Sequence, residues 1–365
     1  MTVDNGDTMD KAVKIRLQNI YNPQAAIFVN NNSGKAALDI KGMVDIETSG
    51  DAYGLYLSGG NMNIGGGSIV AHDTRAIDAF NGTLTLNAKY DENGNIKAAD
   101  KELEVDINGN IRSYGKNKTA IGLNTDKSTF TGAIHTADSG KVDMLLSNGA
   151  LWTNKLAASQ TGFAGSKVNQ LVGGISADKA GQILQKDSNS IDVNDYSGHI
   201  VLVYEHTNDG SEAGHFTAGD THIKNAAVGS SITMSTDNNG IDTKNTELVN
   251  KVLNNLAGKL YYDAYTTGEK NLSGKVQIDS GLTVSSVYKD VIAGDMSFND
   301  KTGKGQYGQG IVQPPQPQPE PQPQPQPEPQ PEPQPEPQPE PQPEPQPPTP
   351  TPNPDKPVVP QLPGN

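Results

Sequence analysis

The sequence predicts an all-β body wound as a parallel β-helix, a solenoid, followed by a disordered polyproline II tail. Of the 26 prolines, 25 lie between Pro314 and Pro363, and the residues before them contain only Pro23. The chain has 39 glycines but only 5% aromatic residues, a composition typical of short strands joined by many turns. Segments of the first half also repeat with a period of about two dozen residues, as successive coils of a solenoid do.

The repeat is visible in three segments. Each has a glycine, an apolar pair around a polar residue, a polar turn, an alanine and a second apolar alternation: GMVDIETSGDAYGLYL from Gly42, GSIVAHDTRAIDAF from Gly67 and GNIRSYGKNKTAIGL from Gly109. Ala52 and Ala76 are one such period apart. The longer spacing from Ala76 to Ala120 is interpreted as about two periods with a charged excursion over residues 89–102. An earlier copy is expected at residues 26–29.

Stacking of such coils explains the composition. Coils of a β-helix lie about 4.8 Å apart, so each strand position forms a column of similar side chains, here Ala, Ile, Leu and Val in a narrow interior. Gly and Asn at the corners supply the positive φ that sharp bends need. With about 24 residues per coil, the body would hold roughly a dozen coils and rise about 60 Å.

The second half of the body keeps the alternation and adds a short helix. The pattern is more compact between Asp138 and Asn194, where Trp152 is the only tryptophan, and alternation returns at residues 197–204 and 229–234. An amphipathic helix is predicted after an N-cap at Asn245 or Thr246 and before a terminating Gly258. We expect it to cap the stack with the stripe Leu248, Val249, Val252, Leu253 and Leu256.

The tail is a spacer. Alternating prolines disfavour helix at the intervening residues and leave polyproline II as the accessible conformation. Fully extended at about 3.1 Å per residue, the run from Pro314 to Pro348 would span roughly 110 Å. Residues 1–137 are therefore assigned to β-helix repeats, residues 138–312 to a second β-helical part, and residues 313–365 to a disordered Pro/Gln/Glu-rich linker.

Charge and cysteine content exclude several classes of protein. The net charge is −14, and the tail from Pro314 contributes −6, since six Glu and Asp355 are offset only by Lys356; the body therefore carries −8. We find no Lys/Arg cluster, which disfavours nucleic acid as a partner. The absence of Cys excludes disulfides, Cys-ligated zinc and a thiol nucleophile.

Targeting signals are not apparent. No apolar run approaches the roughly 18 to 20 residues of a membrane-spanning helix, and the N-terminal MTVDNGDTMDKAVK lacks the apolar core of a signal peptide. We expect either a cytosolic protein or a fragment whose export signal and anchor lie outside this chain.

The order of parts resembles the passenger of a monomeric autotransporter of the type V secretion pathway, close to the pertactin-like group. The resemblance rests on three regions. They are the Gly-rich repeats from about Ala36 to Leu151, the run from NGALWTNKLAA through DYSGHIVLVYEH and AAVGSSITMSTDNNGIDTKN to KLYYDAYTTGEKNLSGKVQIDSGLT, and the PQPQPEP tail. Together they cover essentially the whole chain.

The resemblance implies a right-handed parallel β-helix, delivered by its own C-terminal outer-membrane β-barrel. The C-terminal coils would fold first, so residues 138–312 would include an autochaperone-like region with Trp152, and the proline-rich linker would precede the barrel. No signal peptide precedes Met1 and no barrel follows Asn365. The chain would then be an excised or truncated passenger, displayed at the bacterial cell surface, anchored at the outer membrane or secreted.

Catalytic or metal-binding histidines are not expected. The last four of the six histidines lie close together in sequence, and Glu205 adjoins His206, but none has HExxH spacing: His72, His135, His199, His206, His215 and His222. Scattered strand and turn histidines are the better interpretation. We assign no metal, no cofactor and no catalytic residue.

Two acidic segments were weighed as sites. Asp91, Asn93, Asn95 and Glu102 satisfy part of a calcium-loop pattern, but no helical pair flanks them, and a β-hairpin turning at Asn93-Gly94 explains the same residues. Weak calcium binding by this segment stays open.

The second segment is HDTRAID, residues 72–78. It places His72, Asp73, Arg75 and Asp78 close together, as a polysaccharide lyase requires, but neighbouring copies offer no second acidic row, so a solvated corner is favoured. A GxSxG elbow is absent, and Gly115-Lys116 lacks the rest of a P-loop.

The leading functional hypothesis is a non-catalytic surface protein, an adhesin or host- and biofilm-contact factor of the virulence-factor kind, expected as a monomer. Its coil faces would present polar and aromatic side chains to host or bacterial glycans or matrix proteins. Tyr53, Tyr56 and Phe80 are candidate exposed contacts, but their alternating positions equally favour burial in the coil for at least one of them, so we nominate no binding residue. One alternative is a β-helical carbohydrate-active enzyme, such as a polysaccharide lyase or a tailspike-like protein. Another is a scaffold for a functional domain upstream of Met1.

Overall fold

The computed structural model describes residues 1–307 apart from residues 23, 32, 34, 157–164, 208–213, 238–239, 265–269, 273–274, 278–281, 289–290 and 300. Contacts divide the chain into two units, Met1–Gln316 and Pro317–Asn365. The expected polyproline II tail lies outside the described residues.

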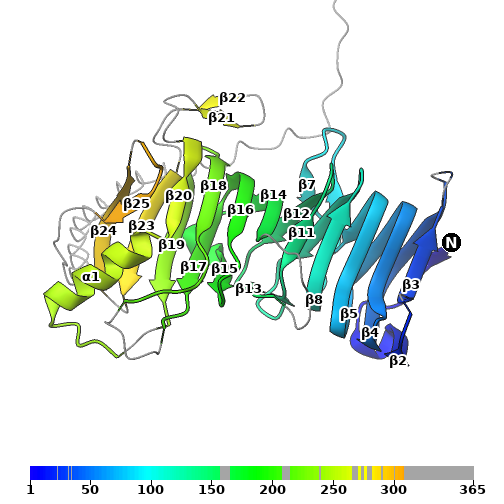
Figure 1. Ribbon diagram of the computed structural model, residues 1–365. Coiled ribbons are helices and arrows are strands. Elements are labelled where there is room, and N and C mark those ends of the chain that lie inside the picture. Colours follow the sequence, from blue (N-terminus) through cyan, green and yellow to red (C-terminus); the bar gives the residue numbers. More distant parts are fainter. Residues whose placement is uncertain are drawn as a thin grey trace, which may run out of the picture. The chain divides into compact units, whose positions relative to one another are not determined.

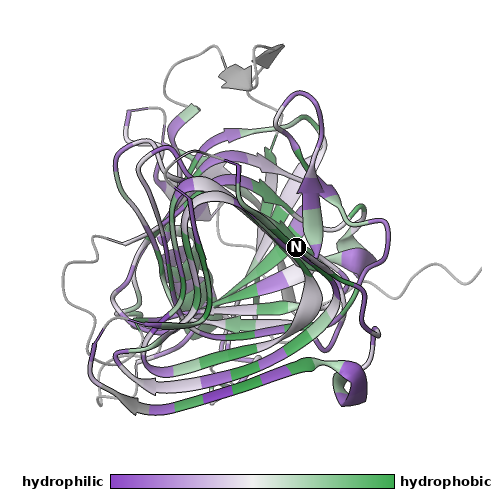
Figure 2. Cartoon of the chain, turned by 90° about the vertical axis from the view of Figure 1, so that its right-hand side faces the viewer, coloured by the Kyte–Doolittle hydropathy of each residue, from purple (hydrophilic) through white to green (hydrophobic). Residues whose placement is uncertain are grey.

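The first unit is a parallel β-helix whose strand pairings fall into three rows, here called the first, second and third faces (Figure 1). Viewed from the N-terminal end, strands of successive coils overlie one another around a common interior (Figure 2). Long strands turn corners and contribute to more than one face, because β4 (Ala37–Gly50) and β5 (Tyr53–Leu86) continue through bulges. The sequence-predicted β-helical fold is confirmed.

The strands follow the three faces in order. The first face contains β2 (Val13–Ile20), β4, β5, β8 (Val105–Tyr114), β10 (Thr129–Thr131), β13 (Leu151–Asn154), β15 (Gly181–Gln185), β17 (His199–Tyr204), β19 (Ser230–Thr236) and β23 (Leu282–Tyr288). The second contains β3 (Ala25–Asn30), β5, β8, β11 (Ile134–Thr136), β14 (Ser166–Val172), β16 (Ile191–Ser197), β18 (Thr221–Ala226) and β20 (Leu260–Tyr262). The third contains β1 (Thr2–Val3), β4, β5, β9 (Lys118–Leu123), β12 (Lys141–Leu146) and the later parts of β14, β16 and β18.

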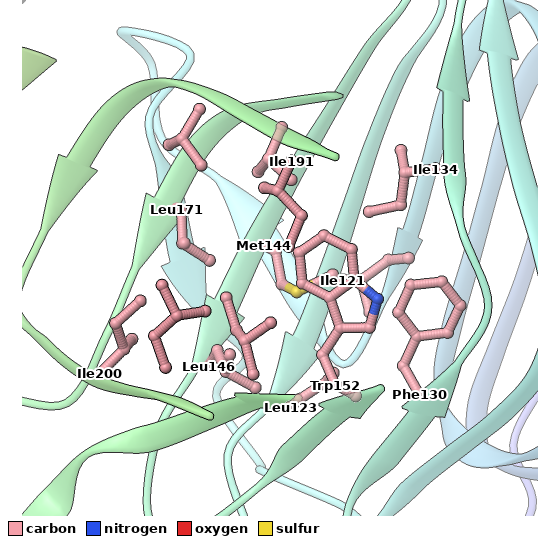
Figure 3. Packing of buried hydrophobic residues seen from close by; sticks show 14 of the residues in the cluster. Ile121, Leu123, Phe130, Ile134, Met144, Leu146, Trp152, Leu171, Ile191 and Ile200 are labelled. Atoms are coloured by element: carbon pink, nitrogen blue, oxygen red, sulfur yellow. The ribbon is translucent and has the colours of Figure 1, made fainter. Parts of the chain in front are cut away.

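One column of inward side chains runs through the first face. The registers connect ten rungs: Ile15, Ile46, Ile69, Ile107, Phe130, Trp152, Ile183, Leu202, Met234 and Ser286. From Ile46 to Met234 every rung is 0% exposed. Figure 3 shows the middle of this core, where Trp152 lies beside Phe130. Burial of apolar surface along this column stabilises the stack.

The coils are less regular than the sequence suggested. Ile183 and Leu202 are paired neighbours in successive coils and are separated by a short stretch of sequence. Ile232 and Val284 are also paired neighbours, but the sequence between them is more than twice as long. Insertions between strands therefore contain residues that a uniform period would have placed in additional coils. Nine steps of about 4.8 Å give a rise of about 43 Å rather than 60 Å.

The alanine repeat was only partly right. Ala52, Ala76 and Ala120 are all fully buried, but Ala120 pairs with Thr85 instead of lying two coils beyond Ala76. The segment between them forms a hairpin, β6 (Ala88–Tyr90) and β7 (Ile96–Ala98), that leaves the coil. One enlarged coil thus replaces the two expected periods. The earlier copy at residues 26–29 is confirmed within β3.

Asparagines occupy corners as expected. Asn87 has a φ of 51° and is 1% exposed. Its Oδ1 accepts a hydrogen bond from the backbone N–H of Leu103 at 2.8 Å, and its Nδ2 donates to the carbonyl of Gly122 at 3.0 Å. A short amide side chain both tolerates the left-handed bend and satisfies backbone groups of two neighbouring turns.

The C-terminal end combines the predicted helix with antiparallel strands. The helix α1 spans Thr246–Ala257, and the Oδ1 of its N-cap Asn245 accepts from Leu248 N at 3.2 Å. It packs on β19, β23, β24 (Val291–Phe298) and β25 (Gly305–Tyr307). Because β24 and β25 pair antiparallel to β23 and to each other, they end the parallel ladder. The remaining short elements are η1 (Met9–Lys11), η2 (Ala177–Lys179), β21 (Lys270–Leu272) and β22 (Lys275–Gln277).

Candidate functional site

The outer surface of the second face gathers aromatic and arginine side chains from four successive coils. We call this set the aromatic–arginine cluster: Phe28, Tyr53, Tyr56, Arg75, Asp78, Phe80, Arg112 and Tyr114. Alternation along the strands places them there. Ile77 and Ile111 are paired and fully buried, so the next residues, Asp78 and Arg112, are paired on the opposite side of the strands.

The rings of the cluster form two contacting groups. Phe28 stacks on Tyr56 with ring centroids 4.7 Å apart and planes 7° apart, and Tyr53 meets Tyr56 edge to face at 5.5 Å. One coil further, Phe80 and Tyr114 lie 4.8 Å apart. Phe28 is 52% exposed, and the others are half-buried. Such rings offer apolar surface to a ligand with little loss of conformational freedom.

A fully buried carboxylate holds the two arginines. Asp78 Oδ2 accepts from Arg75 Nη1 at 3.2 Å and lies 3.1 Å from Arg112 Nε, while its Oδ1 accepts from Arg112 Nη2 at 3.3 Å. Arg75 Nη1 also donates to Tyr53 Oη at 3.4 Å. The Arg112 guanidinium lies 3.9 Å from the Tyr114 ring centroid, in cation–π contact. Asp78 thus fixes both cations among the rings.

The outward row continues along the same face beyond the cluster. Arg112 pairs in register with His135, and Lys167, Asp192, His222 and Tyr261 occupy consecutive paired positions further along. The His222 and Tyr261 rings stack at 4.6 Å. Lys167, Asp192 and His222 also line a pocket of about 460 Å³. The face therefore offers an extended surface with rings at both ends and charges between them.

Sequence reasoning found part of this site. Tyr53, Tyr56 and Phe80 were named as candidate contacts, and the structure brings them together. Phe28 and Tyr114 were missed, although the sequence held a signal for Tyr114. Ile77-Asp78-Ala79-Phe80 and Ile111-Arg112-Ser113-Tyr114 share the spacing of an inward isoleucine and an outward ring, and the structure pairs them position by position.

The HDTRAID segment divides between two places. His72 Nε2 lies 2.8 Å from Glu47 Oε1, with both side chains about half exposed, and Asp73 Oδ2 accepts from Gly50 N at 2.8 Å. Arg75 and Asp78 instead belong to the aromatic–arginine cluster. His72 and Asp73 are therefore separated from Arg75 and Asp78, which contact each other. The expected solvated corner is wrong for Asp78, which is fully buried.

The other histidines also have separate neighbours. His199 Nδ1 lies 2.5 Å from Ser231 Oγ, and His206 Nδ1 lies 2.7 Å from Asp237 Oδ1. Glu205, adjacent to His206, forms an ion pair with Lys186. Within the described residues, no three His, Asp or Glu side chains gather as a metal site.

The segment weighed as a calcium loop is the hairpin between β6 and β7. Asp91 Oδ1 accepts from the backbone N–H groups of Asn93 and Asn95, at 2.9 and 2.8 Å. Gly94 follows with a φ of 76°. The carboxylate thus closes a turn, as the hairpin interpretation predicted.

A buried carboxylate attaches this hairpin to the third face. Asp143 is 1% exposed; its Oδ2 accepts from Tyr90 Oη at 2.6 Å, and its Oδ1 accepts from Asn169 Nδ2 at 2.9 Å and Gln170 N at 3.0 Å. Burial raises the pKa of Asp143 above the usual value for a carboxyl group, and the hydrogen bonds offset this only in part.

Replacing Asp143 by Asn tests how the protonation of this buried carboxyl group affects the stability of the protein. A raised native pKa means that the folded protein binds the proton more tightly, so the stability linked to Asp143 is greatest below its unfolded pKa of about 3.9 and is lost as the pH rises through the native pKa. The unfolding free energy of the wild type, minus that of Asp143→Asn, should therefore fall as the pH rises above about 4. Urea titrations from this acidic range to neutrality measure it.

Asp91→Asn is the comparison variant, because the pKa of Asp91 is shifted in the opposite direction to that of Asp143. Hydrogen bonds from the Asn95 backbone lower the Asp91 pKa, so its contribution is present above the unfolded pKa and is lost as the pH falls. Equal slopes for the two variants would contradict the proposed role of burial at Asp143.

A second carboxylate lies nearby on the third face. Asp195 pairs in register with Gln170, and burial raises its pKa as well. Asp143 and Asp195 both line a pocket of about 230 Å³ together with Lys118 and Lys141. Two acids with raised pKa values in one depression resemble the requirement for general acid–base catalysis.

Comparisons with protein-family models, with curated proteins and with solved structures find no match for this chain. The helices in the described part of the chain are too short or too polar to span a bilayer. The argument for a binding site therefore depends on the geometry of the faces.

Proposed function

We propose that this chain is the surface-displayed passenger of a bacterial autotransporter and acts as a non-catalytic adhesin. Its ligands would be glycans or matrix proteins of a host or of other bacteria, bound along the second face. The proline-rich tail would hold the β-helix away from an outer-membrane barrel encoded beyond this chain, so that the face is accessible. The resemblance in sequence supports the display and secretion parts of this proposal, and the aromatic–arginine cluster supports the binding part.

The observation that carries the proposal is the partial exposure of aligned rings on successive coils. Folding alone would favour placing Phe28 inside, yet it is 52% exposed while it stacks on Tyr56. Exposed aromatic groups with adjacent arginines are typical of binding surfaces.

Truncation of the stacked rings should reduce binding without unfolding the protein. We expect the double variant Phe28→Ala/Tyr56→Ala to bind at least about tenfold more weakly to any partner found in a glycan and matrix-protein screen, because contact rings at binding sites contribute a few kcal/mol. Biolayer interferometry with the full chain measures the affinity.

Exposed apolar residues elsewhere provide the control. Ile175 is 92% exposed and Val228 is 77% exposed, so Ile175→Ala/Val228→Ala removes apolar surface away from the cluster. Unchanged binding by the Phe28/Tyr56 variant would contradict the proposal, and absence of binding by the wild type to every glycan and matrix protein would favour a scaffold.

The Asp143–Asp195 pocket supports a second candidate, a β-helical carbohydrate-active enzyme. Asp143 would be the acid and Asp195 the base of a hydrolase acting on a sugar chain along the third face. Against this, Asp143 already accepts three hydrogen bonds within the protein. Release of reducing ends from polysaccharides, abolished in Asp195→Asn, would establish the enzyme in place of the adhesin.

A further inference from the structure

The middle of the second face is positively charged, in contrast to the acidic chain. Arg75 and Arg112 share the single carboxylate of Asp78, which leaves a local excess of one positive charge among the rings in a protein whose net charge is −14. Lys167 adds a further, exposed cation on the same face, but it pairs in register with Asp192. The excess is therefore centred on the two arginines, and Lys167 borders it.

His135 lies near the positively charged side chains of the second face. Its pKa is lowered by burial and then by Arg112, Arg75 and Lys167. Three cations from three coils thus act on one imidazole, although the β11 strand that carries it places no Lys or Arg there itself. Their charges converge on the outer surface near His135, where an anionic group would be attracted.

From this arrangement we propose that the ligand of the second face is an acidic glycan. Its sugar rings would pack on Phe28 and Tyr56, and its carboxylate or sulfate groups would contact Arg112 and Lys167. This inference rests on the proposed function and adds the chemical class of the ligand. Arginine provides paired N–H groups for a carboxylate or sulfate, and the half-buried Arg112 loses less of that attraction to solvent screening than the exposed Lys167 does.

A glycan fits the face better than other polyanions do. Nucleic acid is bound through many cations along its phosphates, whereas this part of the face has three, two of which share the carboxylate of Asp78. An acidic peptide would use an exposed strand edge or a helix groove, but the part of β8 that carries Arg112 is paired on both sides, with β5 and with β11.

Matched pairs of glycans test the inference. The full chain would be titrated with a hyaluronan oligosaccharide and an oligogalacturonate, and with the carboxyl-reduced form of each. We expect at least one acidic form to bind about tenfold or more tightly than its neutral counterpart, with the difference shrinking as salt increases. Arg112→Gln and Lys167→Gln should each remove most of the preference for the acidic form.

Arg16→Gln is the matched control. Arg16 also pairs with an aspartate, Asp45, at 2.9 Å, but it lies on the first face in β2. Lys167→Gln leaves the Arg75–Asp78–Arg112 contacts intact, so it separates loss of ligand charge from local unfolding.

The outcomes distinguish this inference from the proposed function. Equal binding of acidic and carboxyl-reduced forms, lost in Phe28→Ala/Tyr56→Ala, would overturn the acidic ligand and leave the adhesin. Failure of both acidic oligosaccharides to bind, or tighter binding of a single-stranded oligonucleotide or an acidic peptide at this face, would also overturn the acidic glycan. Loss of preference in Arg16→Gln as large as in Lys167→Gln would show that the second face is not involved.

Discussion

Replacing Trp152 by Ala should cost about 3–5 kcal/mol of the free energy of unfolding, the range for removing a buried aromatic side chain. Trp152 is fully buried, stacks on Phe130 at 5.7 Å and pairs in register with Ile183. Its Nε1 donates to the carbonyl of Gly132 at 3.0 Å, and the variant removes this donor as well. Figure 3 shows how centrally the indole lies.

The position of Trp152 in the column predicts more than a loss of stability. In a solenoid each coil contacts only its neighbours, so a weak rung divides the cooperative unit. We expect urea unfolding of Trp152→Ala, followed by far-ultraviolet circular dichroism, to separate into two transitions. Ile175→Ala removes apolar atoms from a side chain that is 92% exposed and should change stability by less than about 0.5 kcal/mol. A loss below about 1 kcal/mol in Trp152→Ala would contradict a continuous core.

The general fold followed from the sequence because its physical causes are local. Apolar alternation and the glycine and asparagine corners each act within one coil, and the helix was signalled by its own stripe and N-cap Asn245. The prediction of α1 was therefore correct in type and close in bounds. The expected interior of small side chains was wrong, because Trp152, Phe130 and four tyrosines are fully buried.

The register could not be obtained in the same way. The step from Ile77 to Ile111 includes the β6–β7 hairpin, which the alanine spacing treated as part of a second period. What fixes the hairpin is the Tyr90–Asp143 hydrogen bond and its attachment to coils that come later in the sequence. Contacts between residues so distant in the chain leave no local signature.

The candidate site illustrates the same limit. Tyr53, Tyr56 and Phe80 attracted notice as rings at alternating positions. Their neighbours Phe28 and Tyr114 belong to other coils, and only the correct register aligns them. Asp78 was considered as a lyase acid, but the structure gives it two arginine partners. The register of the strands therefore determines which side chains of different coils meet in the candidate site.

Replacing Asp78 by Ala should destabilise the protein by up to about 3–5 kcal/mol, the cost of leaving two half-buried cations without their counter-charge. Asp78 is fully buried and contacts both Arg75 and Arg112. Asp45→Ala is the control, since Asp45 pairs with Arg16, whose side chain is 44% exposed, and exposed pairs contribute about 1 kcal/mol or less. Denaturant titrations of the two variants measure the difference.

Removing the arginines together with Asp78 separates stability from binding. The triple variant Arg75→Met/Asp78→Leu/Arg112→Met leaves no unpaired buried charge, and apolar replacement of a buried ionic group is often neutral or stabilising. We expect it to recover most of the stability lost in Asp78→Ala while it binds ligand no better. Recovery of binding along with stability would mean that the ligand needs neither Arg75 nor Arg112. Stability without binding would mean that the ionic triad is retained because its arginines bind the ligand.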